Sequence, residues 1–164
     1  MKKKIVGFIM SIAFLFLLIT PGLKAQVDID KLSIKPYLVA IVVSDAKKTI
    51  SWYEQNLGFK TFKVFEIPEF RGKVYFIKRG DFQIEVIEND KSLPKQEMTL
   101  PEGVEFLQGY LKLAFFTDNL DGLTKQLKYN KVDILIDITK DPLSGYRFIL
   151  IEDNEGNTIQ IYGT

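Results

Sequence analysis

The sequence predicts an α+β fold in which two βαβββ modules pair into an open curved barrel around a shared cup. Two observations lead to this fold class. The same order of strand-like and helical segments occurs twice along the chain, and each copy leaves one face of its sheet uncovered, because a single helix packs against only one set of alternating side chains. Two copies set edge to edge provide the missing cover, and their second faces line one cup.

The first copy begins with "YLVAIVVSD" (residues 37–45), an apolar run typical of a buried strand that ends at a helix-capping residue. The following segment, "AKKTISWYEQNLGF", places Ile50, Tyr53 and Leu57 at helical spacing, and Gly58 ends it. Three strand-like runs come next: "FKTFKVFEI", "KVYFIKRG" and "FQIEVIE".

The second copy repeats this order. It begins with "YLKLAFFTD" and continues with "NLDGLTKQLKYNKV", in which Leu120, Leu123 and Leu127 mark the inner face of a helix. Its three remaining strands are "DILIDIT", "YRFILIED" and "TIQIYG", with "DNEGN" as the turn between the last two. Each copy therefore reads as β-α-β-β-β.

The N-terminus has the composition of an export signal. The basic start "MKKK" precedes a run of apolar residues, the pair Pro21-Gly22, and "LKA", in which Ala25 precedes a plausible cleavage point. The apolar run is shorter than the roughly 20 residues of a bilayer-spanning helix. We therefore expect an exported protein, periplasmic or extracellular, with no membrane attachment after cleavage. The alternative is an uncleaved anchor.

The expected domain organisation follows from these segments. Residues 1–25 form the signal peptide, and residues 26–164 form one domain. Within it, module one spans about 34–88, a linker about 89–109, and module two about 110–163. The linker is polar and contains two prolines, which favours a surface connection, although its apolar residues leave a flap over a site as an alternative.

The composition excludes several kinds of site. The chain has 0 histidines and 0 cysteines, so it cannot build a His-ligated or thiolate metal centre, a Ser-His-Asp triad or a Cys-His pair. Cleavage of the signal would leave a mildly acidic chain without a basic stripe. We therefore expect no nucleic-acid partner.

Two of these segments resemble a known family. "SDAKKTISWYEQNLGF" and "FILIEDNEGNTIQIYG" are similar to motifs of the glyoxalase/bleomycin-resistance/extradiol-dioxygenase family, the vicinal oxygen chelate superfamily. Asp45, Trp52-Tyr53 and Leu57-Gly58-Phe59 stand at its motif positions, whereas Asn154 stands where the family usually has proline. The resemblance extends from Ile34 to Gly163.

The resemblance implies a metal held by four side chains, at positions that fall on Leu38, Glu85, Lys112 and Gln160. Leucine has no donor atom and a protonated lysine repels a cation. We therefore expect no cofactor and no metal. The alternative is a divalent metal recruited through Glu85, Gln160 and nearby oxygens.

These substitutions also predict an internal pair. In the shared cup, Lys112 would form an ion pair with Glu85 and a hydrogen bond with Gln160, because an inward acid and an inward base are each costly without a partner. The pair is read either as a ligand anchor or as a remnant that keeps the former metal pocket neutral. The predicted ligand-binding residues are Leu38, Ala40, Glu85, Lys112, Ala114, Phe116 and Gln160. A cup filled by its own side chains is the alternative.

We therefore predict an exported, metal-free protein that binds a small, partly hydrophobic molecule in the cup, as bleomycin-resistance proteins do by sequestration. We assign no catalytic residue. The resemblance implies histidine at two of the metal-ligand positions, and the presence of Leu38 and Lys112 there argues against an enzyme. A glyoxalase-like lyase, isomerase or epimerase with non-standard metal ligands is one alternative, and a non-binding scaffold is another. The sequence leaves open whether the protein is a monomer or a homodimer.

Overall fold

The computed structural model describes residues 33, 35–67, 72–105 and 109–164, and residues 36–164 form one compact unit. The predicted signal peptide, residues 1–25, lies outside the described residues. Within the described part of the chain, no helix is long and apolar enough to cross a bilayer.

Module one contains one helix and four strands. These are β1 (Leu38–Val43), α1 (Ala46–Leu57), β2 (Lys60–Ile67), β3 (Gly72–Arg79) and β4 (Phe82–Glu88). The sheet has the order β1-β4-β3-β2, in which β1 is parallel to β4 and the other neighbours are antiparallel.

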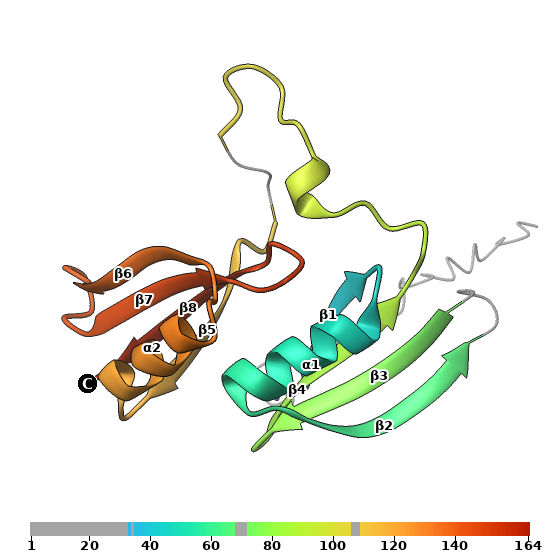
Figure 1. The fold of residues 1–164 in the computed structure, drawn as a ribbon, viewed down its shortest axis with the longest axis horizontal. Coiled ribbons are helices and arrows are strands. Elements are labelled where there is room, and N and C mark those ends of the chain that lie inside the picture. The colour runs from blue at the N-terminus through green and yellow to red at the C-terminus, as the bar shows by residue number, and fades with distance from the viewer. Residues whose placement is uncertain (1–32, 34, 68–71, 106–108) are drawn as a thin grey trace, which may run out of the picture. The chain divides into compact units, whose positions relative to one another are not determined.

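Module two has the same topology. Its elements are β5 (Lys112–Thr117), α2 (Leu120–Tyr129), β6 (Ile134–Lys140), β7 (Arg147–Glu152) and β8 (Thr158–Gly163), with the sheet order β5-β8-β7-β6. Each helix lies along one side of its own sheet (Figure 1). The prediction of two βαβββ modules is confirmed, and the two four-stranded sheets do not close into a barrel.

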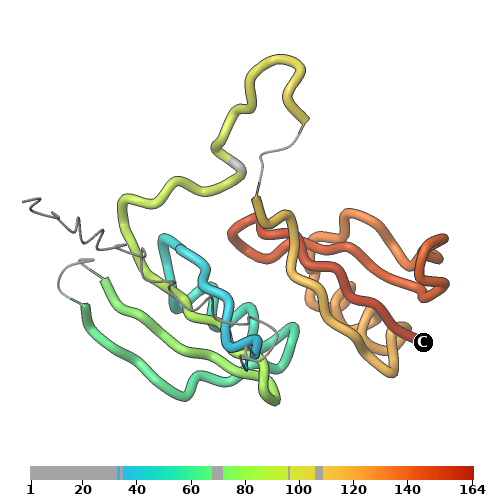
Figure 2. Tube along the Cα trace, turned by 180° about the vertical axis from the view of Figure 1, so that it is seen from behind, coloured from blue at the N-terminus to red at the C-terminus, as the bar shows by residue number. Residues whose placement is uncertain are grey.

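The linker leaves β4 and returns to β5 as a long loop (Figure 2). Its only regular element in the described residues is a 3₁₀ helix, η3 (Lys95–Glu97).

Both α-helices begin at the capping residues that their sequences provide. The Asp45 carboxylate accepts a 3.0 Å hydrogen bond from the backbone N–H of Lys48, and the Asn119 side chain accepts one of 2.8 Å from Gly122. Helix α1 ends at Gly58, whose φ of 67° is left-handed and therefore suits glycine. Helix α2 ends at Tyr129, earlier than the predicted Val132, because Asn130 forms its C-cap.

One hydrophobic core receives side chains from both modules. Ile84 and Val86 from β4 and Ile159 and Ile161 from β8 lie on the helix-facing sides of the two sheets and are almost completely buried. Their burial follows from the packing of one helix against one set of alternating side chains in each sheet. The core therefore lies on the helix side of each sheet.

The opposite side of each sheet is called its open face. The strand register shows which side chains share it, because directly paired residues point to the same side. Open face one consists of Leu38, Ala40, Val42, Gln83, Glu85, Ile87, Val74, Phe76, Lys78, Lys60, Lys63 and Phe65. Open face two consists of Lys112, Ala114, Phe116, Thr158, Gln160, Tyr162, Glu152, Leu150, Phe148, Ile136 and Thr139.

The modules touch each other through residues on the helix side. The ring of Phe115 packs edge-on against those of Phe59 and Phe82, with centroids 6.1 and 5.4 Å away. The Asn130 side-chain amide, at the end of α2, donates a 2.8 Å hydrogen bond to the Asn56 oxygen on α1. These contacts fix the docking of module two on module one.

Candidate ligand-binding site

A cavity of about 830 Å³ lies between the edge strand of module one and the start of the edge strand of module two. Its walls are formed by residues 38–42, 92–95 and 110–113 with Phe82, Glu155, Asn157 and Thr158. Five consecutive residues of β1 contribute, from both alternating sets, so the cavity runs along the edge of the strand rather than across one face. Its volume is within the range of roughly 300–1,000 Å³ that is common for sites of small ligands.

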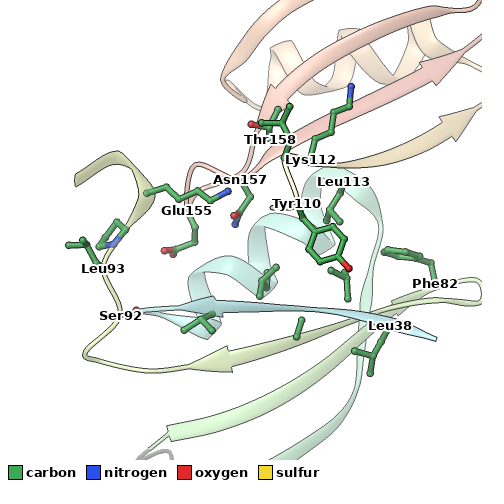
Figure 3. Close-up of a pocket in the computed structure, with 17 residues that line it drawn as sticks. Leu38, Phe82, Ser92, Leu93, Tyr110, Lys112, Leu113, Glu155, Asn157 and Thr158 are labelled. Atoms are coloured by element: carbon green, nitrogen blue, oxygen red, sulfur yellow. The ribbon is translucent and has the colours of Figure 1, made fainter. Parts of the chain in front are cut away.

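The walls of the cavity are mainly apolar, with a polar group at one end. Leu38, Ala40 and Leu113 contribute apolar side chains, whereas Glu155 and Asn157 come from the turn between β7 and β8. In Figure 3, Glu155 and Asn157 extend from the segment that leads into β8 toward β1. A ligand in the cavity would therefore meet an apolar surface and a cluster of oxygen and nitrogen atoms at its end.

Hydrogen bonds hold Glu155 in place. The buried Thr49 hydroxyl on α1 donates to Glu155 Oε1 over 3.2 Å, and the Asn154 amide donates to the same oxygen over 2.9 Å. The Asn154 amide also donates to the Thr49 oxygen over 2.9 Å. The carboxylate at the polar end of the cavity is thus positioned by a residue of the other module.

Two buried side chains, Asp153 and Tyr53, stabilise the turn between β7 and β8. Asp153 Oδ1 accepts 2.9 Å hydrogen bonds from the backbone N–H groups of Glu155 and Asn157, and its Oδ2 accepts one of 2.8 Å from the Tyr53 hydroxyl. Burial raises the pKa of Tyr53 above its ordinary value, and the neighbouring Asp153 carboxylate raises it further. Tyr53 is therefore a neutral donor that ties α1 to the turn.

The structure brings only part of the predicted ligand-binding set to this cavity. Leu38, Ala40 and Lys112 line it. The remaining predicted residues lie on the two open faces, outside the walls of this cavity: Glu85, Ala114, Phe116 and Gln160. Phe116 lines a second, smaller cavity of about 380 Å³, together with Phe59 and Arg79.

Lys112 forms one of its two predicted contacts. Its ammonium donates a hydrogen bond to the Gln160 side-chain oxygen, and Figure 3 shows its nitrogen directed away from Leu38 and Ser92. The pKa of Asp141 is lowered mainly by the Ser144 hydroxyl and by backbone N–H groups, with a smaller contribution from the charge of Lys112. Lys112 is an exposed residue rather than a buried one.

The predicted ion pair between Lys112 and Glu85 is not among the ion pairs of the described residues. The reason lies in the docking of the modules. Glu85 belongs to open face one and Lys112 to open face two, and both faces lie on the side of their sheets opposite the shared core. The prediction that the two side chains meet within one chain was wrong.

Comparison with known proteins assigns the fold to a family. The sequence model of the Glyoxalase/Bleomycin resistance protein/Dioxygenase superfamily matches residues 36–161. The chain belongs to this superfamily.

Several solved structures share the fold at low sequence identity. A glyoxalase family protein from Enterococcus faecalis is 20% identical, with a TM-score of 0.67, and the match covers 78% of this chain and 96% of that one. TioX from Micromonospora sp. ML1 is 17% identical, with a TM-score of 0.57 over 79% of this chain and 98% of that one. A variant of glyoxalase I from Zea mays is 17% identical, with a TM-score of 0.61 over 77% of this chain and 43% of that one. No curated protein matches the sequence.

The residues at the superfamily's metal positions do not fit a divalent metal. Leu38 has no donor atom, and the Gln160 oxygen already accepts a hydrogen bond from the Lys112 ammonium. Only the carboxylate of Glu85 remains, whereas such metals take several oxygen or nitrogen ligands. Within the described ranges, no group of three His, Cys, Asp or Glu residues could hold a metal ion.

Sequence reasoning missed part of the cavity wall. The linker residues 92–95 and the residues Tyr110 and Leu111 before β5 line the cavity, although the linker was expected to be mainly a surface connection. A signal was present in Leu93 and Pro94, an apolar pair within a polar segment. Glu155 and Asn157 were recognised as turn residues but not as part of a site.

Proposed function

We propose that this superfamily member is an exported, metal-free protein that binds a small, partly hydrophobic molecule in the cavity between β1 and β5. The observation that carries the proposal is the cavity itself, about 830 Å³ with apolar walls and a polar end. Among the four positions at which the resemblance implies metal ligands, Leu38 has no donor atom and Lys112 carries a positive charge. These side chains argue against metal-dependent turnover. The predicted signal peptide at residues 1–25 supports export.

The chemistry of the walls limits the ligand. A carboxylate only accepts hydrogen bonds, and the Asn157 amide and Thr158 hydroxyl both donate and accept them. A molecule with an apolar body and a polar end that carries at least one N–H or O–H group therefore matches the lining. Its body would contact Leu38, Ala40 and Leu113, and its polar end would lie near Glu155.

The mode of action that we propose is sequestration. The lining contains no histidine or cysteine, and its carboxylate accepts hydrogen bonds from Thr49 and Asn154. The superfamily name includes bleomycin resistance proteins, and holding a molecule without changing it needs only a shaped, partly apolar cavity. The protein would lower the free concentration of its ligand in the compartment to which it is exported.

A thermal-shift screen tests this proposal. Amphipathic antibiotics and metabolites with an amine or hydroxyl group are added to the purified protein, and a binder at 100 times its Kd stabilises the fold by about 2.7 kcal/mol. The Ala40→Trp variant fills the cavity and is expected to abolish the shift. The Ser51→Trp variant adds the same side chain to the exposed face of α1 and is expected to retain it.

Two outcomes would contradict the proposal. One is that no compound in the panel shifts the melting temperature. The other is that a compound shifts wild-type protein and Ala40→Trp equally, which would place its binding elsewhere. A stoichiometric transition metal found by elemental analysis of the purified protein would separately reject the metal-free part of the proposal.

A further inference from the structure

The smaller cavity, of about 380 Å³, has walls from both modules. Module one contributes the end of α1 and the turn between β3 and β4, and module two contributes the end of β5 and one residue each from α2 and β8. Its volume is near the lower end of the range of roughly 300–1,000 Å³ that is common for sites of small ligands. A small molecule would therefore fit it.

The walls of this second cavity are mainly apolar. Leu57, Leu123 and Ile161 contribute aliphatic side chains, and Phe59 and Phe115 contribute aromatic rings. The two rings pack edge to face, with centroids 6.1 Å apart, an arrangement that a further aromatic ring can extend. An aliphatic or aromatic body in the cavity would meet carbon atoms from both modules.

One permanent positive charge borders these apolar walls. Arg79, the last residue of β3, donates a 2.7 Å hydrogen bond from Nη1 to the carbonyl oxygen of Leu57 at the end of α1. A guanidinium has five N–H donors, and Arg79 forms no other hydrogen bond and no ion pair with the residues that the structure describes. Its side chain is exposed, so the charge lies at the opening of the cavity and most of its donors can reach a ligand.

A hydroxyl group from the other module adds a second donor. Thr117, the last residue of β5, lines the cavity, and its Oγ1 accepts a 3.3 Å hydrogen bond from the backbone N–H of Asn119. A hydroxyl also donates one hydrogen bond, and Thr117 donates its own to no described residue. No acidic side chain is among the described lining residues. The lining therefore favours an anion.

We propose that this second cavity is a binding site for a small monocarboxylate with an apolar body, such as an arylacetate or a short fatty acid. The Arg79 guanidinium donates two charge-assisted hydrogen bonds to the carboxylate, and the Thr117 hydroxyl donates a third. The apolar body lies against the rings and aliphatic side chains behind them. The bond to Leu57 orients the guanidinium before the ligand arrives, so less conformational freedom is lost on binding.

The second cavity is separate from the cavity of the proposed function. No described residue lines both. The ring of Phe82, which lines the first cavity, packs against Phe115 of the second, with centroids 5.4 Å apart. The two sites also select opposite chemistry, because the Glu155 carboxylate accepts hydrogen bonds whereas Arg79 and Thr117 donate them. The inference therefore does not depend on whether the first cavity binds a ligand.

Pairs of compounds that differ in charge test the site on the wild-type protein. Phenylacetate and hexanoate are each compared with their neutral amides, phenylacetamide and hexanamide, in titrations followed by the backbone N–H signals in NMR spectra. We expect both carboxylates to shift the signals of Gly80 and Thr117 saturably. The amides should bind about ten-fold more weakly, because they lack the charge that pairs with Arg79.

Variants assign the binding to the two donors and to the cavity. Arg79→Gln should weaken phenylacetate binding about ten-fold, and Thr117→Val, which keeps the shape of the side chain, about three-fold. Leu123→Trp fills the cavity and should abolish binding. Lys125→Gln removes an exposed positive charge elsewhere on α2 and should bind like wild type. Circular dichroism checks that each variant is folded.

Four results would overturn the proposal. Neither carboxylate shifts any signal saturably, or the amides bind as tightly as the carboxylates. Signals of residues 38–42 shift in place of those of Gly80 and Thr117, which would place the ligand in the first cavity. Lys125→Gln weakens binding as much as Arg79→Gln, which would indicate a general effect of charge. The comparison with the amides uses wild-type protein, so it decides the matter even if Arg79→Gln does not fold.

Discussion

The Tyr53 hydroxyl on α1 donates a 2.8 Å hydrogen bond to Asp153 in the turn before β8, and both side chains are buried. This bond joins the helix of module one to the turn of module two. The same Asp153 carboxylate holds the backbone N–H groups of Glu155 and Asn157, which border the cavity. The shape of the polar end of the cavity therefore depends on how the two modules dock.

Removing this hydroxyl should lower the stability of the fold. In Tyr53→Phe, Asp153 keeps its donors from Glu155 and Asn157 but loses the phenol, so we expect a loss of about 1–2 kcal/mol in the free energy of unfolding. Urea denaturation measures it. Tyr129→Phe removes the hydroxyl of an exposed tyrosine and should cost nothing measurable. Equal stability of Tyr53→Phe and wild type would mean that the bond contributes little.

Tyr53 also predicts a loss of stability in alkaline solution. Its pKa is raised in the folded state by burial and by Asp153, whereas in the unfolded chain it is about 10. Above pH 10 the unfolded chain loses this proton and the folded one keeps it, so the stability contribution is present below pH 10 and falls as the pH rises. Between pH 9 and pH 11 wild type should lose about 1.4 kcal/mol more than Tyr53→Phe. Parallel pH profiles for the two proteins would contradict this assignment.

Thr49 should affect both stability and ligand affinity. Its buried hydroxyl bridges Glu155 and Asn154, so Thr49→Val removes the bridge while keeping the shape of the side chain. We expect a loss of about 1 kcal/mol in the free energy of unfolding and weaker binding of any ligand found in the screen. Thr49→Ser retains the hydroxyl and should behave like wild type, as measured by denaturation and by titration calorimetry. If Thr49→Val and Thr49→Ser bind equally, Thr49 has no role in orienting Glu155.

Gly163 is required by the close approach of β8 to β5. A Cβ atom at this position would lie 2.6 Å from the Thr117 carbonyl oxygen and 2.9 Å from Leu120 Cβ. Gly163→Ala should therefore force the strands apart and cost about 1–3 kcal/mol. Thermal and urea unfolding measure this loss, with Ser51→Ala on the exposed side of α1 as the reference. An unchanged midpoint would show that the end of β8 moves freely.

Much of the fold could be predicted from local patterns. Strand β4, for example, was predicted at residues 82–88 and lies at Phe82–Glu88, because its apolar alternation belongs to the segment itself. The alternation also separates the two faces of the strand, and Ile84 and Val86 on one of them are buried. Such signals lie within one element, so they can be read without knowing the rest of the structure.

The candidate site was less predictable because it depends on how elements far apart in sequence meet. Alternation placed Glu85 and Lys112 on the second faces of their sheets, but it does not say which faces meet. The docking of the modules is decided by contacts such as the hydrogen bond between Asn130 and Asn56. No pattern in the sequence around either residue predicts that contact. The contribution of residues 92–95 to the cavity wall was missed for the same reason.

The parallel pairing of the first and last strands of each module affects the order in which the chain can fold. Leu38 pairs with Gln83, and Lys112 pairs with Thr158, so β1 and β5 must each wait for a strand that is synthesised much later. During synthesis or export, the apolar β1 therefore has no strand partner until β4 has emerged. A nascent chain that stops before β4 would expose this strand to neighbouring chains, and a chaperone that shields it at that stage would act on module one before module two exists.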